Sequence, residues 1–129
     1  MKNIFILITL LALLLTASNA YSTQIKTAHA IGIFHENGNG ENIQHLRKTK
    51  DDYNGTCFSK IVIFGKLNNI LPEVRIGSSK GSFVRSIAIY NKQKIKIAQE
   101  MTFKHNNVKK GYLEVRIKNK LYDSKVFIK

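Results

Sequence analysis

Apolar and polar residues alternate through the C-terminal part of the chain, residues 82–129. Leu113, Val115 and Ile117 alternate with charged residues, a pattern that places one set of side chains in a core and the other in water. Turn-forming residues close each run of alternation, and four runs follow one another, at residues 83–90, 95–103, 112–118 and 125–128. Alternation with a period of two predicts β-strands, so we expect a meander of consecutive strands.

The preceding part of the chain predicts further strands, at residues 28–34, 59–65 and 73–76. The middle one holds a continuous run of Ile, Val, Ile and Phe, which is rich in β-branched side chains and predicts a central strand. Pro72 has no backbone N–H and suits an edge or the start of a strand. Residues 35–42 are typical of a loop, whereas residues 42–50 fit either a strand or a short helix.

Short runs at this spacing favour an all-β fold over alternating strands and helices. We expect an antiparallel β-sandwich or barrel-like meander of about seven short strands.

The first 20 residues have the pattern of a secretory signal peptide. Lys2 precedes an apolar run at residues 4–15, and the small residues Ser18 and Ala20 follow it. The run is shorter than the roughly 20 residues that cross a bilayer. We therefore expect a cleaved signal peptide at residues 1–20, a secreted chain without a membrane span, and one β domain over residues 21–129.

Two positions predict the state of the exported protein. Cys57 is the only cysteine, and the apolar residues that follow it favour a buried, unpaired and slowly reacting thiol. Asn54, Gly55 and Thr56 form an acceptor for N-glycosylation, which in a eukaryotic protein would place Asn54 on a surface turn.

The formal net charge is +13, and most of the basic excess lies in residues 82–129. Such a field attracts polyanions, so a sulphated glycan or an anionic membrane surface is an expected partner, with an extracellular protein as the alternative. We expect no specific nucleic acid, because the chain is predicted to be exported. Alternation sends four basic side chains away from the core, and they form the predicted polyanion site if their strands share a sheet: Lys94, Lys96, Arg116 and Lys118. The alternative is that lysine serves solubility alone.

Candidates for catalysis are few. The chain has four histidines, but it has no nucleophile elbow and no histidine pair at metal-binding spacing. We therefore predict no catalytic residue, no metal site and no cofactor, and a function in binding. The alternative is a small secreted effector or toxin with hydrolytic activity. It would require a concave site in which His35, His45 or His105 is hydrogen-bonded to an acid.

The order of these elements also resembles a known family. Ile31-Gly32 and the strand at residues 60–65 look like its opening and central motifs, Gly40-Glu41 stands in place of its Gly-Asp-Arg, and the C-terminal runs fall where its later strands lie. On these motifs the chain resembles the multiprotein bridging factor two family of small secreted insect proteins, which includes salivary secreted peptides. The resemblance implies an all-β, extracellular, non-enzymatic protein, and it supplies no catalytic residue.

Overall fold

The computed structural model describes residues 24–129, so the predicted signal peptide at residues 1–20 lies outside the described range. Strands make up the secondary structure of this range, they pair antiparallel, and no helix occurs among them. The prediction of an all-β, sandwich-like fold is therefore confirmed. The strands outnumber the predicted ones because several short pairings follow the long runs.

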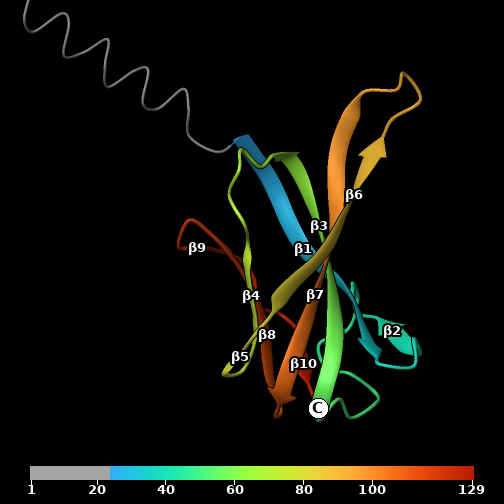
Figure 1. Cartoon of the computed structure of the whole chain (residues 1–129), viewed down its shortest axis with the longest axis vertical. Coiled ribbons are helices and arrows are strands. Elements are labelled where there is room, and N and C mark those ends of the chain that lie inside the picture. Colours follow the sequence, from blue (N-terminus) through green and yellow to red (C-terminus); the bar gives the residue numbers. More distant parts are fainter. Residues whose placement is uncertain (1–23) are drawn as a thin grey trace, which may run out of the picture.

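The first sheet contains the long strands and is called here the long-strand sheet (Figure 1). Its spatial order is β2-β1-β3-β7-β6. The strands are β1 (Gln24–His35), β2 (Gly40–Asn42), β3 (Gly55–Lys66), β6 (Ser82–Tyr90) and β7 (Lys96–Val108). β3 pairs along most of its length with both β1 and β7, which confirms its predicted central position.

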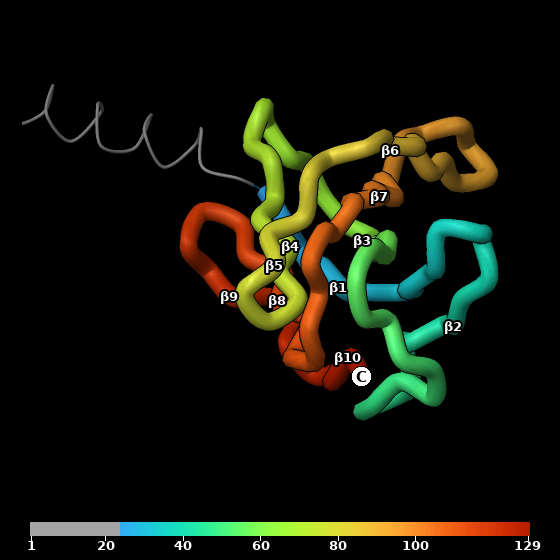
Figure 2. Tube along the Cα trace, turned by 60° about the horizontal axis from the view of Figure 1, so that its bottom comes forward, coloured from blue at the N-terminus to red at the C-terminus, as the bar shows by residue number. Residues whose placement is uncertain are grey.

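The second sheet, called the short-strand sheet, packs against one face of the first. Its order is β10-β8-β4-β5, and β9 pairs with β8 beside this path. The strands are β4 (Glu73–Ile76), β5 (Ser79–Lys80), β8 (Gly111–Ile117), β9 (Lys120–Asp123) and β10 (Phe127–Ile128). The segments around β9 and β2 project from opposite sides of the molecule (Figure 2).

The four C-terminal runs do not form one continuous meander. β6 pairs with β7 and β8 pairs with β9, but β7 and β8 belong to different sheets. Residues 42–50 also differ from the prediction, because beyond β2 they form neither a strand nor a helix. Backbone hydrogen bonds order them instead, since Thr49 N donates to Phe127 O at 2.9 Å and Phe127 N donates to Arg47 O at 2.8 Å.

One hydrophobic core lies between the two sheets. It is built from the inward side of the alternating strands, as the period of two predicts. Cys57 is fully buried in this core and is a free thiol, as expected. The largest apolar side chains in it that are almost fully buried are Tyr53, Phe103, Ile33, Ile43, Ile61, Ile63, Ile76, Leu113, Ile117 and Ile128.

A buried carboxylate joins the two sheets. The pairing of β1 with β3 shifts register between Ala30 and Gly32, which leaves an irregularity in β1. Ala30 N donates a hydrogen bond of 2.9 Å to Asp123 Oδ2 at the end of β9, and Lys125 N donates one of 3.2 Å to Asp123 Oδ1. Asp123 is only 6% exposed. The carboxylate thus satisfies a backbone donor of the other sheet at a point where the strand is irregular.

β6 is the outer strand of the long-strand sheet and is exposed on both faces for most of its length. β6 contains no lysine, and Arg85 is its only charged residue. Its exposed large apolar side chains are Phe83, Val84, Ile87 and Tyr90.

We predict that Asp123→Ala lowers the free energy of unfolding by about 1–3 kcal/mol, because two backbone N–H groups lose their acceptor. Asp123→Asn keeps one acceptor oxygen and should cost less. The measurement is urea unfolding, with exposed Asp52→Ala as the control. Equal stability of Asp123→Ala and wild type would show that the carboxylate does not hold the sheets together.

Candidate functional site

The structure divides the four predicted polyanion-binding residues between two sheets. Lys94 and Lys96 lie where the chain turns from β6 into β7, in the long-strand sheet, whereas Arg116 and Lys118 lie on β8 and just beyond it. The condition that their strands share a sheet is therefore not met. Arg116 also lies among acids, since its Nε is 3.6 Å from Glu114 Oε2. Its charge is therefore partly compensated.

The turn between β6 and β7, residues 90–97, is called here the hairpin tip. It extends beyond the ends of β1 and β3 (Figure 1). Asn91 shapes it, because Asn91 Oδ1 accepts hydrogen bonds from Gln93 N at 2.9 Å and from Ile95 N at 3.0 Å. Lys94 has a φ of 63°, in the left-handed region, and its N–H donates to Asn91 O at 3.0 Å. The tip is therefore a turn of defined shape.

The hairpin tip exposes large apolar side chains beside lysines. Tyr90 and Ile95 are each 60% exposed and Ile97 is 40% exposed. The same stretch contains three exposed lysines and no acid: Lys92, Lys94 and Lys96. Sequence reasoning assigned the apolar residues to strands and so to the core. Their exposure could have been inferred from their position next to a turn, because residues close to a turn can extend beyond the edge of the opposite sheet.

A concave region lies at the end of β1, with a volume of about 530 Å³, and is lined by polar residues that include His35, Asp51 and Thr56. His35 Nε2 lies 3.4 Å from Asp51 Oδ2, and the imidazole stacks on the Tyr53 ring with a centroid distance of 4.3 Å. This is the arrangement that the hydrolytic alternative requires, a histidine hydrogen-bonded to an acid in a concave site. The hydrogen bond is long, and Asp51 is 67% exposed.

The carboxylate of Glu41 fixes the loop that contains Asp51. Its oxygens accept hydrogen bonds from Tyr53 Oη at 2.6 Å, Lys50 N at 2.8 Å and Asp51 N at 3.1 Å. Desolvation raises the pKa of Glu41, but these hydrogen bonds outweigh it and lower the pKa below its usual range. Burial, followed by the bond to Glu41, raises the pKa of Tyr53 well above its usual range. Both groups therefore stay in their ordinary charge states and fix the loop.

The His35 and Asp51 pair lacks a nucleophile in contact with it. Thr56 Oγ1 lies 3.4 Å from Asn106 Oδ1, its hydrogen-bond partner across the strands. Within residues 24–129, no hydroxyl group is hydrogen-bonded to His35, and no group of three or more His, Cys, Asp or Glu side chains is arranged to hold a metal ion. The arrangement can orient an imidazole as a general base toward water.

His105 is also beside a hydroxyl, but it is enclosed in the core. It is fully buried, with Nε2 2.8 Å from Ser59 Oγ and Nδ1 3.4 Å from Ser79 O. A Cβ added at Gly81 would lie 2.8 Å from its ring, so the backbone closes over it. Burial lowers the pKa of His105 to about 4. Its contacts are those of a structural histidine.

The structure also shows the surroundings of Cys57, which is buried, and of Asn54, which is exposed. Burial raises the pKa of the Cys57 thiol to about 12, which leaves little thiolate at neutral pH. Its slow reaction with thiol reagents stays a prediction. Asn54 is exposed directly before β3, and its glycosylation stays a prediction.

No family model, no curated protein and no solved structure matches the chain. The family resemblance noted from the motifs therefore stays a prediction. In the part of the chain that the structure describes, no helix is long and apolar enough to cross a membrane.

We predict that His105 makes the protein less stable as the pH falls from about 6.5 to 4. The folded state holds the imidazole neutral, whereas the unfolded chain takes up a proton below the ordinary pKa of 6.5. The stabilisation is therefore complete above pH 6.5, and about 3 kcal/mol of it is lost by pH 4. Urea unfolding across this range measures the effect.

His105→Gln should flatten this pH dependence, whatever it does to stability at neutral pH. The matched control is His45→Gln, at an exposed histidine. Equal slopes for wild type and His105→Gln would contradict the assignment.

Proposed function

We propose that the protein is a secreted, non-enzymatic binding protein that docks on anionic membrane surfaces through the hairpin tip. The observation that carries the proposal is the exposure of Tyr90, Ile95 and Ile97 in the same turn as Lys92, Lys94 and Lys96. A cluster of exposed apolar side chains on a protruding turn is typical of a surface that contacts a partner.

The apolar side chains suit the boundary between headgroups and acyl chains. Tyrosine is enriched at membrane interfaces, because its ring is apolar and its hydroxyl can remain hydrated. Ile95 and Ile97 would bury aliphatic surface at about 25 cal/mol per Å². Because hydrogen bonds from Asn91 already fix the turn, little conformational entropy is lost on docking.

The lysines select for negative charge. A lysine close to an anionic leaflet contributes about 1 kcal/mol, and its long aliphatic stem can lie along the apolar surface while the ammonium group contacts phosphate. No acid occurs at residues 90–97 to oppose this attraction. The large positive charge of the chain adds a long-range attraction that salt weakens.

We predict that the combined change of Lys92, Lys94 and Lys96 to Gln weakens binding to vesicles of phosphatidylserine and phosphatidylcholine. At about 1 kcal/mol for each lysine the expected loss is roughly 100-fold. Changing Tyr90, Ile95 and Ile97 to Ser should remove the part of the binding that persists in high salt. Vesicle co-sedimentation at low and high salt measures both effects.

The matched control changes Lys104, Lys109 and Lys110 to Gln, which removes the same charge at the opposite end of β7. It should retain most of the binding. If both lysine variants lose the same binding affinity, net charge explains the binding and the hairpin tip has no special role. If the protein is retained on heparin but does not bind vesicles, the partner is a sulphated glycan and not a membrane.

A second candidate function is hydrolysis, and it rests on the contact between His35 and Asp51. An imidazole oriented by a carboxylate can act as a general base on water. The length of the contact, its exposure and the lack of a contacting nucleophile place this candidate second.

For the hydrolytic candidate we expect His35→Gln to lower kcat/KM by about 10²–10⁴-fold on any substrate that is turned over. The probes are nitrophenyl derivatives of an acyl ester, a phosphodiester and a glycoside. Asp51→Asn should show a smaller loss, and Asp52→Asn is the matched control. Turnover that is absent, or equal in all variants, would exclude this site as the source of hydrolysis.

A further inference from the structure

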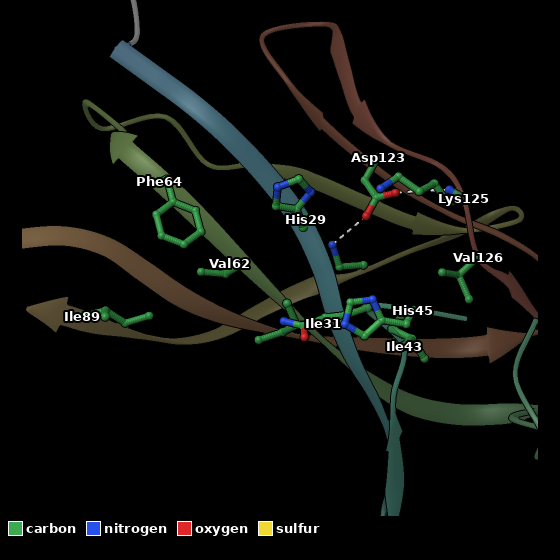
Figure 3. Close-up of a pocket in the computed structure, with 12 residues that line it drawn as sticks. His29, Ile31, Ile43, His45, Val62, Phe64, Ile89, Asp123, Lys125 and Val126 are labelled. Carbon is green, nitrogen blue, oxygen red and sulfur yellow. Dashed lines mark hydrogen bonds between the residues drawn. The ribbon is translucent and has the colours of Figure 1, made fainter. Parts of the chain in front are cut away.

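An apolar groove begins on the outer face of the long-strand sheet and reaches across β1 to the end of β9 in the short-strand sheet (Figure 3). The cross-strand register places Phe64 of β3, Ala98 of β7 and Ile89 of β6 in one row. Phe64 is 37% exposed, whereas Ala98 between its two larger neighbours is fully buried. Phe64 and Ile89 therefore close over Ala98, and the groove is lined by these two side chains together with Val62 of β3.

The groove has a polar end. It is bounded by His29 on β1, by His45 beyond β2 and by Asp123 and Lys125 around the end of β9, and the apolar side chains of Ile43 and Val126 lie beside them (Figure 3). The apolar residues Val62, Phe64 and Ile89 lie together at the other end in the same view. The cavity has a volume of about 510 Å³. This volume falls within the range of small-molecule sites.

The polar end offers donors to an anion. Among residues 24–129, the side chains of His29, His45 and Lys125 make no hydrogen bond or ion pair with another protein group. Asp123 is the only acid in the lining, and its two oxygens already accept the N–H groups of Ala30 and Lys125. Each free polar side chain that lines the groove, Gln44 included, can therefore donate a hydrogen bond, and Lys125 is a cation.

We propose that this groove binds a single-chain amphiphile with a carboxylate head, of the fatty-acid class. The acyl chain lies along Val62, Phe64 and Ile89, and the carboxylate accepts hydrogen bonds from Lys125 and the two imidazoles. A singly charged head fits better than a phosphate, because Asp123 lies beside the site and opposes a second negative charge. The site does not depend on the hairpin tip.

The test is isothermal titration of the whole secreted protein with dodecanoate, dodecanol and dodecyltrimethylammonium, which share one chain and differ in head charge. Dodecanoate should bind at one site, about tenfold or more tightly than dodecanol, as one charge-assisted hydrogen bond provides. Lys125→Gln should reduce this preference, and Lys125→Glu should shift it toward the cationic amphiphile. Phe64→Ser should weaken binding of all three.

Lys110→Glu is the matched charge control, and it should bind dodecanoate as wild type does. The variant with Tyr90, Ile95 and Ile97 changed to Ser should also keep dodecanoate binding, so failure at the membrane and failure at the groove are distinguishable. Equal affinity for dodecanoate and dodecanol, no effect of Lys125→Gln, or no binding would each overturn the proposal.

Discussion

The hydrogen bond between the Ala30 N–H and the Asp123 carboxylate fixes how the two sheets meet. A shift of register in β1 deprives a buried donor of its regular partner, and an unpaired donor at that position would be costly. The acceptor comes from β9, 93 residues further along the chain, so the bond can form only when both sheets are in place. The polar end of the groove is built around the same carboxylate, which couples the shape of that site to the contact between the sheets.

Periodicity predicted the strands well where one face is buried. The bounds of β4 were predicted correctly, and β3 was recognised as central, because a continuous apolar run indicates burial on both faces. The change of sheet between β7 and β8 could not be predicted, since the turn-forming residues between the two runs fit either arrangement. The role of Asp123 was also hidden, because its partner is a backbone group distant in sequence.

The candidate sites were less accessible from sequence than the fold. Alternation assigns a side chain to one face or the other, but it does not say how far the opposite sheet reaches. Ile95 and Ile97 therefore read as core residues, although the short-strand sheet leaves them uncovered. The groove brings together side chains of β1, β3, β6 and the end of β9, which is a property of topology and register rather than of any single segment. The sequence predicted Lys94 and Lys96 as binding residues, but it did not predict that the apolar side chains beside them are exposed.

β6 has a consequence for how copies of the protein behave toward one another. Long exposed edge strands with apolar side chains can pair with the edge of another copy, and proteins commonly place lysine there to prevent it. In this lysine-rich chain β6 has none, so resistance to self-association depends on repulsion between whole molecules of high positive charge. That repulsion reaches only about 8 Å at physiological ionic strength. Colloidal stability is therefore a property of the salt in the surrounding medium as much as of the fold.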